Sequence, residues 1–100
     1  MEDKYILDGK TVVPEPNLKK WGEWVQSNSK NRRVKNDEIN GVRVSTVFLG
    51  LDHSHGGGPP LLFETMVFNG PLDQKQERCS TWGEAEKMHE VMCQRVRRAQ

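Results

Sequence analysis

Several short segments of the chain alternate apolar with polar residues, which is the pattern of a strand with one buried face. The strongest strand signal covers residues 42–51. One face of this segment carries Val42, Val44, Thr46 and Phe48, and the other carries Val47, Leu49 and Leu51. A second apolar run, LLFETMVF at 61–68, is interrupted only by Glu64. The pattern predicts two central strands, and the first of them is apolar on both faces near its end.

Turn dipeptides place further strands beside these two. Asp8-Gly9 divides the β-prone segment 5–13, and Asn40-Gly41 joins a charged segment at 32–39 to the strand that begins at Val42. Both dipeptides suit two-residue hairpin turns, which need positive φ at their central residues. We therefore predict hairpins at both places and a polar loop over residues 72–79.

Two segments have helical periodicity. The first follows Asn17, a suitable N-cap, and places Leu18, Trp21, Trp24 and Val25 at helical spacing. The second begins at Thr81, which forms the T-x-x-E capping-box pattern with Glu84. Its apolar stripe consists of Trp82, Ala85, Met88, His89, Met92 and Val96.

These segments predict a single α+β domain over residues 1–100, in the order β-β-α-β-β-β-α. We expect an antiparallel sheet of about four to five strands with two helices packed on one face. The apolar second face of the strand at 42–51 also suggests a homodimer through the sheet, although a curved monomer would bury the same residues.

Composition narrows the range of functions. Fifteen Lys and Arg residues nearly balance fourteen Asp and Glu residues, which argues against a DNA mimic and against a nucleic-acid coat protein. The basic segment 30–43 and the arginines near the C-terminus leave weak nucleic-acid binding as an alternative. No apolar run approaches the ~20 residues of a membrane span, and no signal peptide is visible. Cys79 and Cys93 are expected to be reduced.

The connection between the two central strands holds most residue types that support binding or catalysis. The predicted ligand or partner-binding residues of this loop are Asp52, His53, His55, Gly56, Gly57, Gly58, Pro59 and Pro60. Long connections between strands are often functional. A flexible connector stiffened by two prolines is the simpler interpretation.

The same loop allows two ligand hypotheses. His53 and His55 would point the same way in an extended segment and are weak metal candidates. His89 could be a third ligand, or Asp52 could orient the histidines through a hydrogen bond. The glycine amides, with Arg43 or Arg78, would contact an anionic ligand such as a nucleotide. No cysteine or carboxylate pair has a spacing that indicates catalysis, so we expect neither an enzyme nor a cofactor.

The central block resembles a known group of proteins. RVSTVFLGLDHSHGGGPPLLFETMVFNG at 43–70, followed by STWGEAEKMHEVM at 80–92, is similar to small proteins of tailed bacteriophages and prophages whose activity is not established. The N-terminal part also fits that pattern, and the basic tail from Arg95 is less typical. The resemblance supplies no catalytic residue. It implies a phage origin and a role in the host bacterial cytoplasm, as a host-takeover or anti-defence inhibitor that binds a host protein or defence complex.

Overall fold

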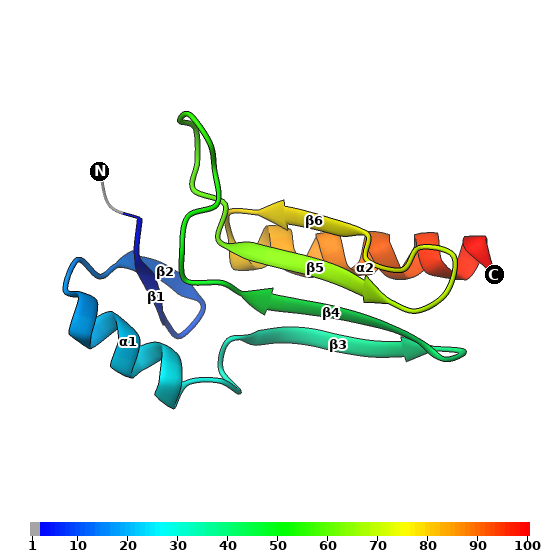
Figure 1. Cartoon of the computed structure of the whole chain (residues 1–100), viewed down its shortest axis with the longest axis horizontal. Helices are drawn as coiled ribbons and strands as arrows, with labels where there is room; N and C mark the ends of the chain where they lie inside the picture. The colour runs from blue at the N-terminus through cyan, green and yellow to red at the C-terminus, as the bar shows by residue number, and fades with distance from the viewer. Residues whose placement is uncertain (1–2) are drawn as a thin grey trace.

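The computed structural model describes residues 3–100, which form two antiparallel sheets and two helices (Figure 1). The first sheet pairs β1 (Tyr5–Asp8) with β2 (Thr11–Pro14). The second has the order β3-β4-β5-β6, formed by Arg33–Ile39, Val42–Phe48, Phe63–Phe68 and Gln76–Cys79. Helix α1 (Leu18–Ser27) follows the first sheet, and α2 (Trp82–Ala99) ends the chain. The predicted α+β class is confirmed.

Three details differ from the sequence-based expectation. The strands form two sheets, and only α2 lies along the four-stranded sheet, whereas α1 packs beside β1 (Figure 1). Part of the predicted polar loop, Gln76–Cys79, is the edge strand β6. An edge strand needs little apolar character, because one of its sides remains in water. The strand predicted to reach Leu51 ends at Phe48, and the chain then turns at Gly50, whose φ is +80°.

The first hairpin forms where Asp8-Gly9 predicted it, but its central residues are Gly9 and Lys10, because Asp8 belongs to β1 and pairs with Thr11. Gly9 has a φ of 63°, and Asp8 is not among the residues with positive φ. The other local signals are confirmed. Asn40 and Gly41 both have positive φ between β3 and β4, at 49° and 84°. The Asn17 side chain accepts a hydrogen bond from the amide of Lys20. Thr81 and Glu84 form the capping box that starts α2.

A register shift in β3 decides which side chains of that strand reach α2. Arg33 pairs with Val47, but Lys35 pairs with Thr46, so Val34 is an extra residue between them. An extra residue exchanges the two faces of a strand beyond that point. The shift places Lys35 and Asp37 on the face covered by α2.

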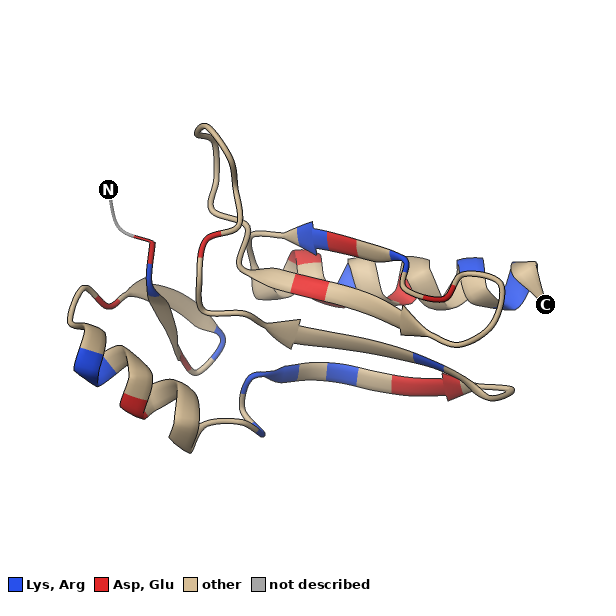
Figure 2. Ribbon diagram, viewed as in Figure 1, with Lys and Arg blue, Asp and Glu red and all other residues tan. Residues whose placement is uncertain are grey.

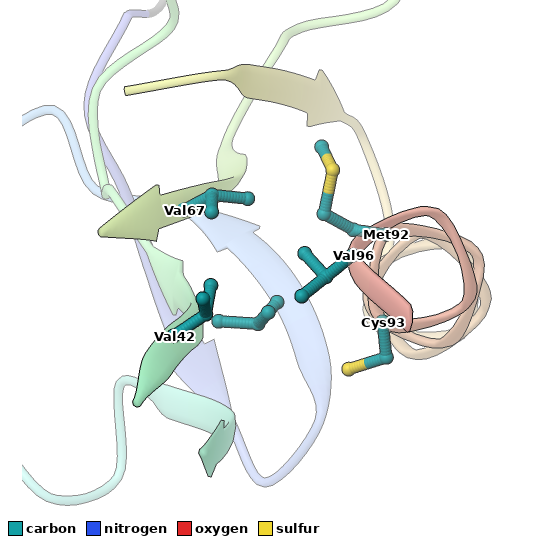
Figure 3. Packing of buried hydrophobic residues seen from close by; sticks show 6 residues of the cluster. Val42, Val67, Met92, Cys93 and Val96 are labelled. Atoms are coloured by element: carbon teal, nitrogen blue, oxygen red, sulfur yellow. The ribbon is translucent and has the colours of Figure 1, made fainter. Parts of the chain in front are cut away.

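The core consists of two clusters on the α2 face of the sheet. Near the C-terminal end of α2, the first cluster contains Val42, Val44, Val67, Met92, Cys93 and Val96 (Figure 3). The second joins the first hairpin, the sheet and the start of α2, and contains Leu7, Phe48, Leu62, Phe63 and Ala85. Burying a large apolar side chain contributes about 1.5–3 kcal/mol, so these clusters supply much of the stability of the fold.

The other face of the four-stranded sheet has no helix from residues 3–100 on it (Figure 1). Its central side chains, among them Val47, Met66 and Phe68, are partly exposed. Arg43 stacks on Phe68, with 4.2 Å between the guanidinium carbon and the ring centroid. Neither described helix is both long and apolar enough to cross a membrane. The homodimer stays a prediction.

A joint near Gly50 fastens the first hairpin to the sheet. The indole N–H of Trp21 lies 3.1 Å from both the Tyr5 and the Gly50 carbonyl oxygens. The Tyr5 amide also donates to the Gly50 carbonyl, at 2.8 Å. A side chain at Gly50 would meet the Trp21 indole nitrogen at 3.3 Å, so only glycine fits here without a shift of its neighbours.

Candidate functional site: the Asp52–Pro60 loop and the His89 relay

The connection between β4 and β5 projects away from the sheet (Figure 1). Backbone hydrogen bonds close its base: the Leu49 amide donates to the Leu62 carbonyl at 2.7 Å, and the His53 amide donates to the Leu61 carbonyl at 3.0 Å. Beyond this base, Gly56, Gly57 and Gly58 have φ of 97°, 105° and 84° and are exposed. The loop is therefore a protrusion with an ordered base and a glycine tip.

Asp52 holds the base of this protrusion together. Its carboxylate accepts hydrogen bonds from the Ser54 amide at 2.8 Å, the Ser54 hydroxyl at 2.9 Å and the Leu61 amide at 2.9 Å. The bonds from Ser54, above all that of its backbone amide, lower the pKa of Asp52. Asp52 thus acts through the shape of the loop, because its oxygen atoms already have partners.

Most of the remaining predicted site residues lie in the outer part of the loop. His55 and Pro59 are exposed with the three glycines, while His53 and Pro60 are partly buried. A Cβ atom added at any of the three glycines would have no heavy atom within 4 Å, apart from its chain neighbours. The accessible part of the predicted set is therefore His55 to Pro59, whereas His53 and Pro60 lie nearer the base of the loop.

A chain of polar side chains that the sequence did not predict lies between the sheet and α2. The hydroxyl oxygens of Thr65 and Thr46 are 2.5 Å apart, and that of Thr46 is 2.7 Å from His89 Nδ1. His89 Nε2 lies 2.7 Å from a carboxylate oxygen of Asp37. We call Thr65, Thr46, His89 and Asp37 the His89 relay. Its first three residues are completely buried, and the Asp37 side chain is 43% exposed.

The proton positions in the relay follow from its acceptors. A carboxylate only accepts hydrogen bonds, so His89 Nε2 donates to Asp37, and this bond is the main cause that lowers the pKa of Asp37. In a neutral ring Nδ1 is then an acceptor, so Thr46 donates to it and Thr65 donates to Thr46. Every member therefore has a partner, as buried polar groups require.

The relay superficially resembles a hydroxyl–histidine–carboxylate triad, but its hydroxyls face the protein core. Thr46, Thr65 and His89 are all 0% exposed, so no substrate reaches the hydroxyl that His89 contacts. The nearby Cys93 is also buried, and burial raises the pKa of its thiol. Burial likewise raises the pKa of Cys79, to about 11. Both cysteines are free thiols with little thiolate at neutral pH.

The predicted metal set of His53, His55 and His89 is not brought together. Within residues 3–100, the group of His, Cys and acidic side chains close enough to share an ion is Asp37, His89 and Cys93, with ligand atoms within 4.8 Å of one another. An ion there would have to replace the bond between His89 and Asp37 and ionise Cys93. Metal binding at these side chains would therefore compete with the hydrogen bonds of the relay.

The arginines predicted to help the loop bind an anion have other contacts. Arg43 lies over the Phe68 ring, and Arg78 forms an ion pair with Glu64, with 3.0 Å between Nε and the carboxylate oxygen. Two signals in the sequence could have indicated the relay. Thr46 is a polar residue on the apolar face of its predicted strand, and His89 lies on the apolar stripe of the last helix. That Thr46 faces Thr65 is known only from the register of β4 and β5.

Comparison of the chain with protein-family models, curated proteins and solved structures finds no match. The resemblance to phage proteins therefore stays a prediction, and the functional argument rests on the residues of this chain.

Proposed function

We propose that this protein is a non-enzymatic binding protein that engages a protein partner through the tip of the Asp52–Pro60 loop. The observation that carries the proposal is the contrast within the loop. Hydrogen bonds from Ser54 and Leu61 to Asp52 order its base, whereas Gly56–Gly58 are exposed and have no packing neighbours. Binding residues are often found on loops that a rigid scaffold positions.

The chemistry of the tip suits a protein surface. Glycine backbone leaves its amides and carbonyls open for hydrogen bonds, and His55 adds a ring that both donates and accepts. Pro59 limits the conformations that the tip must lose on binding, which lowers the entropic cost. Following the resemblance to phage proteins, we propose a host protein or defence complex as the partner and the bacterial cytoplasm as the place of action.

The burial of the His89 relay supports a binding role over an enzymatic one. Its hydroxyl and imidazole groups are 0% exposed and bonded to one another, so they serve the core. Buried networks of this kind fix one arrangement of a fold when all members are satisfied. In this protein the relay links β3, β4, β5 and α2 through side-chain hydrogen bonds.

Photo-crosslinking in bacterial cells tests the proposal. A photoreactive amino acid in place of His55 should give one discrete protein adduct, and the same probe in place of exposed Lys19 on α1 should not. A matched variant keeps the probe at 55 but replaces Gly56–Pro60 with a two-residue turn. It should fold and lose the adduct. An adduct that survives this shortening, or that forms equally from position 19, would contradict the proposal.

A further inference from the structure

A cavity of about 430 Å³ is lined by residues of the first hairpin, the end of α1 and the segment that follows it, the start of β3 and the start of α2. It has the size of a small-ligand site. Two tryptophans, three cationic residues and two asparagines account for most of its wall: Trp24, Trp82, Lys10, Lys30, Arg33, Asn28 and Asn31. No carboxylate residue lines it.

The two tryptophans of the wall belong to one row of packed rings. Trp24 meets Phe48 edge-on at 5.9 Å between ring centroids, Phe48 meets Phe63 at 5.1 Å, and Phe63 meets Trp82 edge-on at 6.2 Å. Phe48 and Phe63 are completely buried, so they fix the two tryptophans from inside. The cavity therefore has aromatic walls that are positioned before any ligand binds.

The cations come from two parts of the chain. Lys10 lies in the turn between β1 and β2, and its Nζ is 5.6 Å from the centroid of the Trp82 ring. Lys30 lies in the turn that follows α1 and Arg33 is the first residue of β3, a region where Figure 2 shows a second group of basic positions. Within residues 3–100 none of the three forms an ion pair with a carboxylate, unlike Lys35 and Arg78. Their positive charge is available to a ligand.

The polar part of the wall is ordered. The Asn28 side chain donates to the Trp24 carbonyl at 2.8 Å and accepts from the Asn31 side chain at 2.8 Å. The Trp82 indole N–H is buried and has no partner in the described part of the chain. Because this nitrogen has less than 1 Å² of exposed surface, a ligand in the cavity would contact other atoms of the Trp82 ring.

We propose that this cavity binds a nucleotide, with the base against the tryptophan rings and the phosphate near Lys10, Lys30 and Arg33. Base–aromatic stacking and cationic side chains are the two usual means of holding such a ligand. A free mononucleotide fits the observations better than a nucleic-acid strand, because the cavity is bounded by residues of four elements and the net charge of the chain is only +1. The site is separate from the loop, so it goes beyond the proposed function.

Titration of the full chain with adenosine monophosphate tests the proposal, with binding measured by calorimetry and by tryptophan fluorescence. We expect saturable binding with quenching, and affinities at least about tenfold weaker for adenosine and for inorganic phosphate, since each lacks one half of the ligand. The double variant Lys30→Gln, Arg33→Gln should weaken binding about tenfold or more. Its control is Lys19→Gln, Lys20→Gln, which removes two exposed charges from α1 outside the cavity and should change the affinity less than about twofold.

Three results would overturn the proposal. One is a lack of saturable binding at about 10 mM nucleotide, a concentration that detects even weak sites. Another is equal binding of inorganic phosphate and nucleotide, or equal loss in both double variants, which would indicate a general charge effect. The third is tighter binding of a short oligothymidylate than of the mononucleotide, which would indicate a single-strand surface. Unfolding curves of each variant without ligand separate lost binding from lost folding.

Discussion

Replacement of Thr46 by valine tests whether the His89 relay acts as a connected unit. Valine has nearly the shape of threonine, so the packing of the core changes little. The hydroxyl of Thr46 lies between two partners, the hydroxyl of Thr65 at 2.5 Å and Nδ1 of His89 at 2.7 Å. Its removal leaves both partners buried and unsatisfied.

The magnitude follows from counting these groups. Each buried group left without a partner costs about 1–3 kcal/mol, so Thr46→Val should lower the free energy of unfolding by about 2–5 kcal/mol. Thr65→Val removes one hydrogen bond and leaves the bond from Thr46 to His89 intact, so it should cost about 1 kcal/mol. The double variant leaves only His89 Nδ1 unsatisfied. It should therefore be more stable than Thr46→Val alone, by about 1 kcal/mol or more.

Urea unfolding of the three variants and the original chain measures these values. An unchanged dependence on urea concentration would show that the unfolded state is the same in all four. In melting temperature, a loss of about 2 kcal/mol corresponds to a decrease of about 10 °C for a domain of this size. If the double variant loses the sum of the two single losses, the two hydroxyls act independently and the relay argument is refuted.

Two further predictions concern titration and metal. The bond from His89 lowers the pKa of Asp37 in the folded state, so this carboxylate adds stability above its ordinary titration range, about pH 4, and loses it as the pH falls through the lower folded value. Asp37→Asn keeps an acceptor for His89 but does not titrate. In urea unfolding at several pH values, the free energy of unfolding of this variant should therefore decrease less in acid than that of the original chain. An equal decrease in both would exclude Asp37 as its source. His53→Ala combined with His55→Ala should leave the melting temperature within about 2 °C of the original, with or without a chelator, because these residues lie outside the cluster of Asp37, His89 and Cys93. A chelator-dependent decrease that the double variant abolishes would restore the loop as a metal site.

Local signals in the sequence predicted most of the fold. Asn40-Gly41 and the Thr81–Glu84 capping box act through neighbouring residues, so their structure is readable from spacing alone. Strand β6 was missed because a polar edge strand forms through pairing with Phe63–Met66, which no local pattern records. The same limit applies to the position of α1, which depends on the bonds of Trp21 to Tyr5 and Gly50.

The candidate sites also differ in how far the local sequence predicts them. The loop was predictable, since its histidines, glycines and prolines lie within one short segment. The partner of His89 was not, because Asp37 lies 52 positions away and reaches it only after the register shift at Val34. The cavity collects Lys10, Trp24, Arg33 and Trp82 from four elements, and their proximity is a property of the folded chain.

The joint at Gly50 gives the loop a mechanical connection to the first hairpin. The chain enters the loop directly after Gly50, whose carbonyl is held by Tyr5 and Trp21, and Lys4 bridges to Leu51 just beyond it. The loop is therefore connected by hydrogen bonds to β1 and α1, in addition to its direct continuation into the four-stranded sheet. The hairpin and α1 also form walls of the cavity. The protruding loop and two walls of the cavity are thus connected through hydrogen bonds of 2.8 to 3.1 Å between Gly50, Tyr5 and Trp21.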